Sequence, residues 1–413
     1  MKYDIAVIGL GYIGLPTASI FAKHGKQVLG VDIRADVVET INQGGIHIEE
    51  PELDVLVRTA VLGGLLRADT KPTAADTFII AVPTPFKAGA AHAHEPDLTY
   101  IESATRSIAS VVQDNNLIIL ESTSPVGTTE KVRDWVTDER TRLQLPAVKA
   151  HYAHCPERIL PGQMIKELVN NDRICGGLTP AAAERACELY RIFCVGEILV
   201  TDARTAEMVK LTENASRDVG IAFANELSMI CDRLKLDVWE VIRLANHHPR
   251  VKILQPGPGV GGHCIAVDPW FIVDSAPEEA RLIRTAREVN NHKPHHVLAR
   301  IQRALAACPV PKVIACLGLA FKSNVDDLRE SPAIEIVGRL SREPNLRVLA
   351  VEPHAETLPN NLADCRVELV STEVALKEAG VVVLLVDHRE FLQIPLSLLT
   401  DKIVIDTRGA WRR

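Results

Sequence analysis

Residues 3–32 read YDIAVIGLGYIGLPTASIFAKHGKQVLGVD, and this stretch decides the fold of the N-terminal part of the chain. An apolar run leads into Gly9, Gly11 and Gly14, which stand in the G-x-G-x-x-G spacing and open a stretch that predicts a helix over about 14–24. A second apolar run ends in Asp32, eighteen residues after Gly14. A strand, a glycine turn, a helix and an acidic residue closing the next strand are typical of a dinucleotide-binding βαβ unit, so the sequence predicts a Rossmann domain.

Each residue of this unit has a chemical task. Gly9 permits the tight turn, Gly11 lets the backbone approach a pyrophosphate, and Gly14 lets the helix pack closely on the strand. The helix N-terminus favours the anionic group. Asp32 accepts hydrogen bonds from a ribose diol and would repel a 2′-phosphate, which favours NAD over NADP, although Arg34 weakens that preference.

The rest of the chain continues the alternation of apolar runs and amphipathic stretches. The runs DTFIIAVPTP and NLIILEST extend a doubly wound parallel sheet, whereas residues 201–246 read as long helices with few breakers. The alternation resumes with KVIACLGLAF, LRVLAVEPH, GVVVLLVDH and DKIVIDTRG. The sequence predicts an α/β protein with a Rossmann domain over 1–200, a central long-helix region over 201–307 and a Rossmann-like domain over 308–413.

Composition narrows the function. The chain has 413 residues, 47% of them apolar and 24% charged, and a net charge of −7, which argues against disorder and against a nucleic-acid partner. No apolar run approaches the ~18 residues of a membrane span. The N-terminus has no basic, apolar leader, so a cytoplasmic protein is expected. The nine cysteines show no C-x-x-C spacing, so neither disulfides nor a metal site is predicted; the histidines within 88–96 favour a solvated insert over a metal site.

Two further features carry candidate chemistry. Cys264 lies in the glycine-rich stretch QPGPGVGGHCIAVDP, residues 255–269, where it is either a nucleophile or a buried thiol in a structural turn; His263 beside it is expected to contact substrate or to pack. Lys210, Asn214 and Arg217 share one helical face at i, i+4 and i+7. That face is either a solvated stripe or a set of donors for an oxyanion and a phosphate.

Seven segments, in this order, resemble the nucleotide-sugar dehydrogenase family, which includes the UDP-glucose dehydrogenases: GLGYIGLP, VPTP, ESTSPVGTTE, CPERILPG, KLTENASRD, NHHPRVKILQPGPGVGGHCIAVDP and FKSNVDDLRESP. The resemblance implies oxidation of a sugar C6 hydroxymethyl group to a carboxylate with two NAD. It also implies that the central helices form the interface of a homodimer or higher oligomer, and that the C-terminal Rossmann-like domain binds UDP.

The resemblance assigns roles to five catalytic residues. Cys264 captures the aldehyde as a thiohemiacetal, which is oxidised to a thioester; Lys210 and Asn214 stabilise the oxyanions. Asp268 positions or activates water. Glu157 is the general base of thioester hydrolysis, unless it only pairs with Arg158.

The same carry-over supplies two sets of binding residues. Those expected at NAD are Gly9, Gly11, Tyr12, Ile13, Gly14, Asp32, Thr84, Thr123, Thr129 and Arg329. Those expected at the nucleotide sugar, some from a neighbouring subunit, are Arg158, Ile159, Lys210, Asn214, Arg217, His248, Arg250, Gly261 and Lys322.

The cysteine loop departs from that of UDP-glucose dehydrogenases, which carry GGSC and then Pro-Lys-Asp, because Ala266 and Val267 stand where Pro and Lys would be. The substrate is therefore expected to be a UDP-2-acetamido sugar. The segments AVDPWFIV and RLIRTAREVN favour UDP-N-acetyl-D-mannosamine, as in the biosynthesis of cell-surface polysaccharide of the enterobacterial-common-antigen type. The alternatives are UDP-N-acetylglucosamine as substrate, a two-electron hydroxyacid-type dehydrogenase, and a catalytically silent nucleotide sensor.

Overall fold

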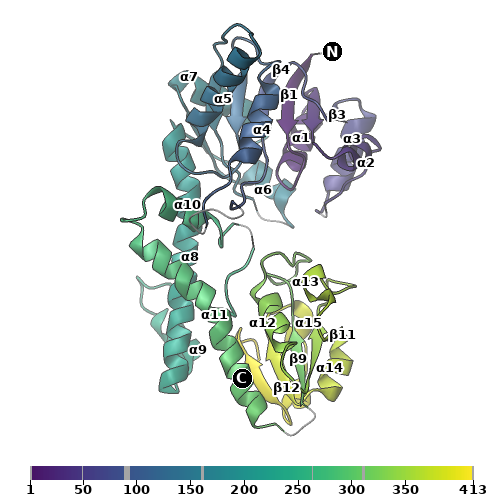
Figure 1. The fold of residues 1–413 in the computed structure, drawn as a ribbon, viewed down its shortest axis with the longest axis vertical. Coiled ribbons are helices and arrows are strands. Elements are labelled where there is room, and N and C mark those ends of the chain that lie inside the picture. Colours follow the sequence, from purple (N-terminus) through teal and green to yellow (C-terminus); the bar gives the residue numbers. More distant parts are fainter. Residues whose placement is uncertain are drawn as a thin grey trace. The chain divides into compact units, whose positions relative to one another are not determined.

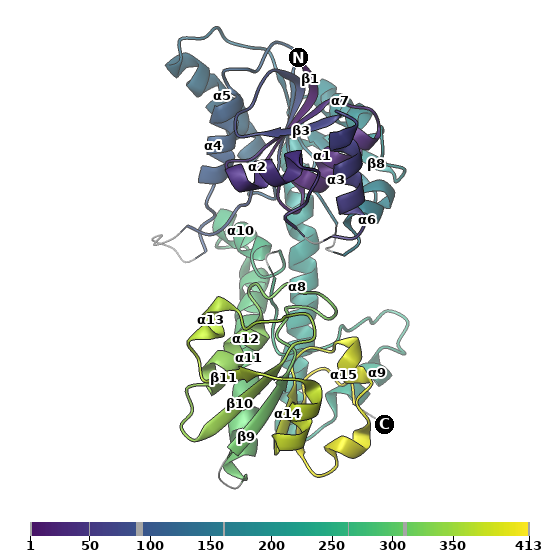
Figure 2. The ribbon, with the colours of Figure 1, turned by 90° about the vertical axis from the view of Figure 1, so that its right-hand side faces the viewer.

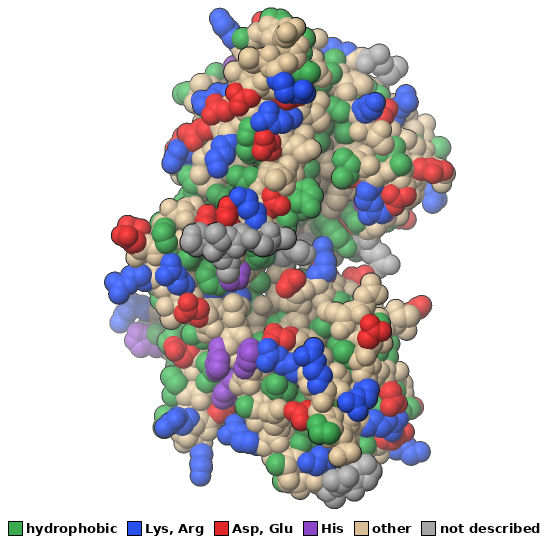
Figure 3. Space-filling model, viewed as in Figure 1, with side chains coloured by type: hydrophobic (Ala, Val, Ile, Leu, Met, Phe, Trp, Pro, Cys, Tyr) green, Lys and Arg blue, Asp and Glu red, His purple; other side chains and the backbone are tan. Residues whose placement is uncertain are grey.

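A computed structural model of the chain describes residues 2–48, 50–87, 94–159, 162–262, 264–308 and 312–411 (Figure 1). It consists of two compact units, Met1–Glu213 and Asn214–Arg413. On the face shown in Figure 3, acidic and basic side chains are interspersed over both units. Among the described residues, no helix combines the length and the apolar character needed to cross a membrane.

The first unit contains an eight-stranded sheet of order β3-β2-β1-β4-β5-β6-β7-β8. The order 3-2-1-4-5-6 is that of the dinucleotide-binding Rossmann fold, so the predicted N-terminal fold is confirmed. The point at which strand order reverses lies between β1 and β4. The strands are β1 (Tyr3–Ile8), β2 (Val28–Val31), β3 (Leu66–Asp69), β4 (Ala75–Ile80), β5 (Leu117–Leu120), β6 (His151–His154), β7 (Arg173–Gly177) and β8 (Ile198–Asp202).

Helices cover both faces of this sheet because its strands are apolar on both sides. Buried side chains of α1 (Gly14–Lys23), α2 (Ala35–Asn42), α3 (Leu53–Leu62), α6 (Met164–Asn170) and α7 (Pro180–Tyr190) share one core. Those of α4 (Thr99–Ile108) and α5 (Thr128–Arg142) form the core on the opposite face. Figure 2 shows α4 and α5 on one side of the sheet and α1, α6 and α7 on the other.

One pair of neighbours departs from the expected parallel sheet: β6 and β7 are antiparallel. Among the described residues between them, the one helix is the seven-residue α6, which packs against α1 instead of crossing the length of the sheet. The chain therefore re-enters the sheet from the edge at which β6 ended.

A 32-residue helix, α8 (Ala203–Leu234), continues from the first unit into the second and confirms the long-helix prediction. In the second unit it packs with α11 (Arg281–Ala306) through a buried polar core: Arg287 pairs with Asp218 at 2.6 Å, and Asn290 bonds both Asp218 and Asn225. Asn225 also accepts the backbone N–H of Gly257 at 2.9 Å. These bonds fix the start of the cysteine loop. The shorter helices nearby are α9 (Val238–Ala245) and α10 (Asp268–Ser275).

The second unit also contains a five-stranded parallel sheet of order β11-β10-β9-β12-β13, the predicted Rossmann-like fold. One face is covered by α11 and α12, the other by α14 and α15. The elements are β9 (Lys312–Leu317), α12 (Pro332–Leu340), β10 (Leu346–Val351), α13 (Asn360–Ala363), β11 (Val367–Leu369), α14 (Thr372–Glu378), β12 (Val381–Leu384), α15 (Arg389–Leu392), a 3-10 turn (Leu396–Leu399) and β13 (Ile403–Asp406).

Candidate active site

The glycines after β1 differ in what requires them. A Cβ on Gly9 would lie 2.4 Å from the Ala81 carbonyl oxygen, and the Gly9 φ of +93° is left-handed. A Cβ on Gly14 would lie 1.8 Å from the Gly9 carbonyl oxygen. A Cβ on Gly11 would meet no protein atom within 4 Å. The turn itself thus requires Gly9 and Gly14, whereas Gly11 leaves open space at the helix N-terminus, where a pyrophosphate binds.

Asp32 is oriented by this turn. Its carboxylate accepts the backbone N–H of Leu10 at 3.0 Å and that of Arg34 at 2.9 Å, one on each oxygen. The Arg34 guanidinium pairs with Asp36. Each Asp32 oxygen keeps a lone pair for a ribose hydroxyl.

Other residues predicted to line the NAD site have separate environments. Tyr12 packs against the core of the first unit, and Ile13 is the N-cap of α1. Thr84 follows β4, and its buried hydroxyl has no hydrogen-bond partner. Thr123 follows β5 and is half-buried. The carboxyl ends of neighbouring strands at the reversal of strand order are where such folds bind nucleotides.

Thr129 and Arg329 have protein partners. The Thr129 hydroxyl donates to Glu207 at 2.6 Å and so ties α5 to α8. Arg329 is exposed and forms two hydrogen bonds with Asp327, at 2.8 and 2.6 Å. Their contact with NAD stays a prediction. The open space at Gly11, the Asp32 acceptor and the unpartnered Thr84 hydroxyl fit NAD.

The glycines of the cysteine loop are needed for packing within the second unit. A Cβ on Gly261 would lie 2.4 Å from the Glu330 carbonyl oxygen. Gly262 has a φ of +81° and lies against the Phe321 ring, which a Cβ would approach to 2.9 Å. The loop is therefore held against the segment that follows β9.

Cys264 is exposed at the end of this glycine run. Its carbonyl oxygen accepts the N–H groups of Val267 at 3.2 Å and Asp268 at 2.9 Å, so the thiol stands on the turn that leads into α10. No disulfide links the nine cysteines, all of which are among the described residues. His263 lies outside the described residues.

Asn214 and Asp268 form the closest contact among the predicted catalytic residues. The Asn214 amide donates to the Asp268 carboxylate at 2.6 Å, and both side chains are buried. Lys210 precedes Asn214 by one turn of α8 and is half-buried, whereas Arg217 is exposed. The structure thus joins the helix with the polar spacing to the turn that carries Cys264.

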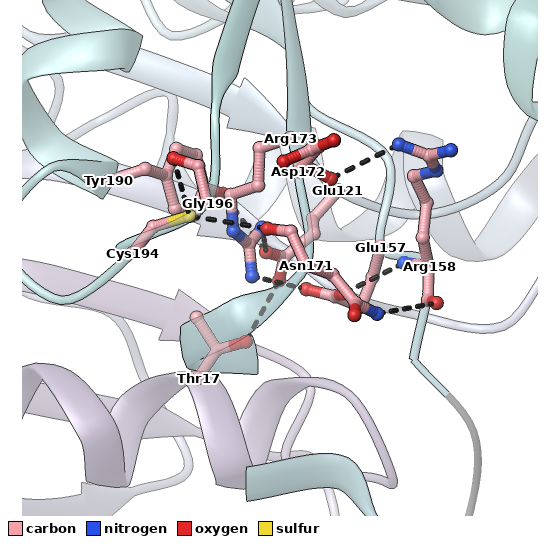
Figure 4. Close-up of polar contacts among 10 residues, drawn as sticks. All are labelled: Thr17, Glu121, Glu157, Arg158, Asn171, Asp172, Arg173, Tyr190, Cys194 and Gly196. Atoms are coloured by element: carbon pink, nitrogen blue, oxygen red, sulfur yellow. Dashed lines mark hydrogen bonds and ion pairs between the residues drawn. The ribbon is translucent and has the colours of Figure 1, made fainter. Parts of the chain in front are cut away.

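Glu157 follows β6 and lies in a buried ionic cluster (Figure 4). Its Oε2 accepts from Arg173 at 2.6 Å, and its Oε1 accepts the backbone N–H of Arg158 at 2.7 Å. The Arg158 guanidinium instead pairs with Glu213 at 2.6 Å. The cation that faces Glu157 is therefore Arg173, a residue that the sequence analysis did not select.

Glu121 completes this cluster and was also not selected. One of its carboxylate oxygens lies 3.8 Å from Arg173, and it accepts hydrogen bonds from the Tyr190 hydroxyl at 2.9 Å and the Thr17 hydroxyl at 3.3 Å. Burial, with a smaller contribution from repulsion by Glu157, raises the pKa of Glu121 to about 7.

The antiparallel register is the signal that finds Arg173. Ala153 pairs with Gly177 and His154 with Gly176. Continued along both strands, this register sets Glu157 opposite Arg173.

The remaining predicted substrate residues are spread over both units. Ile159 packs against the core of the first unit. His248 and Arg250 lie on the exposed turn after α9, where the Arg250 N–H donates to His248 Nδ1 at 3.3 Å. Lys322 is exposed in the segment after β9 that supports the cysteine loop. Their roles stay predictions.

One cluster of potential metal ligands lies in the C-terminal sheet region. His354, His388 and Glu390 bring ligand atoms within 4.8 Å of one another. His388 Nδ1, however, accepts the backbone N–H of Asn324 at 2.9 Å, and its Nε2 lies 3.2 Å from Glu352. Because Nδ1 is occupied by a backbone N–H and Nε2 faces Glu352 in the interior, the geometry indicates a structural role.

Comparison with known proteins agrees with this architecture. Models of the UDP-glucose/GDP-mannose dehydrogenase family match residues 3–194 as the NAD binding domain, 204–292 as the central domain and 315–413 as the UDP binding domain. The chain belongs to the UDP-glucose/GDP-mannose dehydrogenase family. The predicted resemblance, the α/β fold and NAD as cofactor are therefore confirmed.

Individual family members are similar over their full length. An NDP-N-acetyl-D-galactosaminuronic acid dehydrogenase of Ralstonia nicotianae is 59% identical, over 98% of this chain and 96% of the relative. A UDP-N-acetyl-D-mannosamine dehydrogenase of Escherichia coli is 55% identical, over 99% of both chains. The structure of a UDP-D-ManNAc dehydrogenase from Pyrococcus horikoshii superposes with a TM-score of 0.88 at 40% identity, over 100% of this chain and 96% of that one.

Proposed function

We propose that this NAD-dependent nucleotide-sugar dehydrogenase oxidises the C6 hydroxymethyl group of UDP-N-acetyl-D-mannosamine to the carboxylate of UDP-N-acetyl-D-mannosaminuronate, a four-electron reaction. The observation that carries the proposal is the exposed Cys264 on the turn that leads into α10. The first residue of α10, Asp268, accepts a hydrogen bond from Asn214. A thiol at this place provides the covalent tether that two successive oxidations at one carbon require.

The residues of the chain divide the chemistry between them. NAD, when bound, supplies the hydride acceptor for each oxidation. Cys264 Sγ adds to the aldehyde carbon and holds it as a thiohemiacetal, which becomes a thioester in the second oxidation. Water then attacks the thioester carbon, Glu157 takes the water proton, and the carbon–sulfur bond breaks to return the thiol. Lys210 and Asn214 donate to the oxyanion in both tetrahedral stages, and Asp268 orients Asn214 and the water.

The sugar is the finer part of the proposal. The Escherichia coli and Pyrococcus horikoshii relatives support N-acetylmannosamine. The Ralstonia nicotianae relative supports a second candidate, the N-acetyl-D-galactosamine nucleotide. UDP-N-acetylglucosamine remains the alternative from the cysteine loop. The uronate product suits an acidic cell-surface polysaccharide of the enterobacterial-common-antigen type.

The assembly belongs to the same proposal. Phe223, Ile230 and Leu234 lie at i, i+7 and i+11 on α8 and are 55%, 47% and 60% exposed. Such an apolar stripe supports a homodimer formed through the central helices. Cysteines without disulfides support a cytoplasmic protein. Division into domains at 1–200, 201–307 and 308–413 fits the matched models, which leave short gaps at both junctions.

Stoichiometry tests the reaction, and a comparison of substrates tests the sugar. Purified protein with NAD should form two NADH per uronate from UDP-N-acetylmannosamine, with a larger kcat/KM than for the galactosamine, glucosamine and glucose nucleotides. One NADH with release of free aldehyde would overturn the covalent mechanism. A larger kcat/KM for the galactosamine nucleotide would show that the substrate is the N-acetylgalactosamine nucleotide, and it would leave the covalent mechanism unchanged.

A further inference from the structure

The cluster around Arg173 holds two carboxylates and one cation in the interior of the first unit. The side chains of Arg173, Glu157 and Glu121 are 4%, 6% and 0% exposed, and they come from β7, the segment after β6 and the segment after β5. Figure 4 shows these three side chains together with Tyr190, which donates to Glu121 at 2.9 Å. Two ionised glutamates and one arginine leave one uncompensated negative charge, so the charge state of each glutamate acts on the other.

Arg173 occupies the carboxylate that has to accept the water proton. Its guanidinium donates to Glu157 Oε2 at 2.6 Å and so competes with water for that oxygen. The proposed hydrolysis, however, requires Glu157 to take a proton from water. A second negative charge beside the same guanidinium offsets this effect, and Glu121 supplies it at 3.8 Å.

We propose that Glu121 is a positioning residue that competes with Glu157 for the shared Arg173, and thereby controls thioester hydrolysis. The inference rests on the proposed function, in which Glu157 is the general base. When Glu121 is ionised, Arg173 is shared between two carboxylates, which leaves the Glu157 carboxylate freer to accept the proton of water. When Glu121 is protonated, Arg173 pairs with Glu157 alone.

The groups around Glu121 support this switch. Tyr190 on α7 and Thr17 on α1 donate to its carboxylate and hold its orientation. Burial, then the charge of Glu121, raises the pKa of Tyr190 well above its usual range, so the phenol stays a neutral donor. The buried thiols of Cys155 and Cys175 also face Tyr190. Since burial raises the pKa of Glu121 to about 7, the Glu121 carboxyl group changes its charge near neutral pH.

The test isolates the hydrolysis step as a function of pH. The enzyme is mixed with NAD and the UDP-N-acetylhexosamine that it turns over, the reaction is quenched, and the fraction with a covalent adduct on Cys264 is followed by intact mass spectrometry between pH 5.5 and 9. In the unmodified enzyme, the rate of adduct loss should rise with pH through about 7. Glu121→Gln should remove this rise and lower the rate above pH 7 by about tenfold, with the first NADH burst unchanged.

Two further variants distinguish a change in the hydrolysis step from a general effect of misfolding. Tyr190→Phe keeps both charges and removes one donor to the ionised Glu121, so the rise in rate should move to higher pH. Glu139→Gln is the matched control, because Glu139 is a buried glutamate of the same unit that pairs with Arg106 and Arg142 outside the cluster. It should keep the pH profile.

The outcomes separate the two levels of the proposal. If Glu157→Gln does not make the adduct accumulate, the role of Glu157 is wrong and this inference falls with it. If Glu157→Gln traps the adduct while Glu121→Gln and Tyr190→Phe keep the unmodified pH profile, the proposed function stands and this inference is overturned. A lower melting temperature with an unmoved profile in both variants would show a structural role only and would equally overturn it.

Discussion

Replacement of Arg173 by methionine should lower the free energy of unfolding of the first unit strongly. The substitution keeps an apolar side chain of similar length and leaves Glu121 and Glu157 buried without their cation. Breaking a buried pair in this way costs about 3–5 kcal/mol. For a unit of this size, which ends at Glu213, each kcal/mol corresponds to about 2–4 °C, so we expect the melting temperature to fall by roughly 10 °C.

The chain offers a matched control for this substitution. Arg347 also pairs with two carboxylates, Glu368 and Glu378, but its side chain is 44% exposed. Exposed pairs contribute about 0–1 kcal/mol because water and salt screen them. Arg347→Met should therefore change the free energy of unfolding by at most about 1 kcal/mol. The two variants differ in burial and not in the number of ion pairs removed.

The sign of the pH dependence follows from the carboxyl groups that remain. Burial already raises the pKa of Glu121 to about 7, and loss of the Arg173 cation removes an interaction that opposes this shift. The folded variant then binds more protons than the unfolded one, so its free energy of unfolding falls as pH rises from about 4.5 through the native pKa of Glu121. The deficit of Arg173→Met should be larger at pH 8 than at pH 5.5.

Urea unfolding followed by circular dichroism at pH 5.5, 6.5 and 8.0 measures these quantities for both variants. Addition of Glu157→Gln to Arg173→Met removes one of the two orphaned charges and should recover part of the loss at pH 8. Equal losses for Arg173→Met and Arg347→Met, or a deficit that does not depend on pH, would refute the view that the cluster is a desolvated charge network.

Three further predictions concern the candidate site. Cys264→Ser should abolish uronate formation and leave NAD affinity, measured by calorimetry, within about twofold; turnover near the normal rate would exclude covalent capture. Gly11→Ala should weaken NAD binding with an unchanged melting temperature, whereas Gly9→Ala should lower both because its Cβ would meet the Ala81 carbonyl at 2.4 Å; equal melting temperatures would contradict this difference. Asn214→Ala should lower kcat by about 10²-fold, as loss of an oxyanion donor does, and a change in KM alone would argue for a binding role.

Local spacing was sufficient to predict the fold of the NAD-binding unit. Gly9, Gly11, Gly14 and Asp32 lie within one βαβ unit, so their chemistry depends on contacts between neighbouring elements that a sequence pattern can express. The Asp32 bond to the Leu10 N–H is a direct consequence of that unit. The doubly wound sheet follows as well, because alternating strands and helices favour it, but the antiparallel pairing of β6 and β7 does not.

The ionic cluster could not be found in this way, because its members meet only through the sheet. Glu121 follows the end of β5 and Arg173 is the first residue of β7, and β6 lies between these two strands in the sheet. Glu157 meets Arg173 because β7 runs antiparallel to β6. Each of these residues alone reads as an ordinary charged residue near a strand. Their burial, which raises the pKa of Glu121, depends on the tertiary structure and not on local sequence.

The Asn214–Asp268 contact is an intermediate case. Helical spacing placed Asn214 on the correct face of α8, but its partner lies 54 residues further along the chain. No periodicity relates a helix to a glycine loop at that distance. The polar bonds of Asn225 to Asn290 and Gly257, which hold the start of the loop, are long-range in the same sense.

In both sheets, a carboxylate at the end of one strand accepts backbone N–H groups from the loop after the neighbouring strand. The two carboxylates differ in burial, and this difference explains why only the first can accept from the ribose of NAD. Asp32 stands at the end of β2 and accepts one N–H from the loop after β1. Glu352 stands at the corresponding end of β10 and accepts two from the loop after β9, those of Leu319 at 2.7 Å and Ala320 at 3.0 Å.

Glu352 is enclosed by the protein, unlike Asp32. Its Oε2 carries both loop N–H groups and lies 3.2 Å from His388 Nε2, while its Oε1 accepts the N–H of His354 at 3.0 Å. The side chain is 5% exposed, whereas Asp32 is only half-buried. Its Oε1 keeps a lone pair, but burial takes that oxygen out of reach of a ligand diol. The second sheet therefore keeps the topology of a dinucleotide-binding fold with this carboxylate enclosed, which agrees with its match to the UDP binding domain of the family and not to the NAD binding domain.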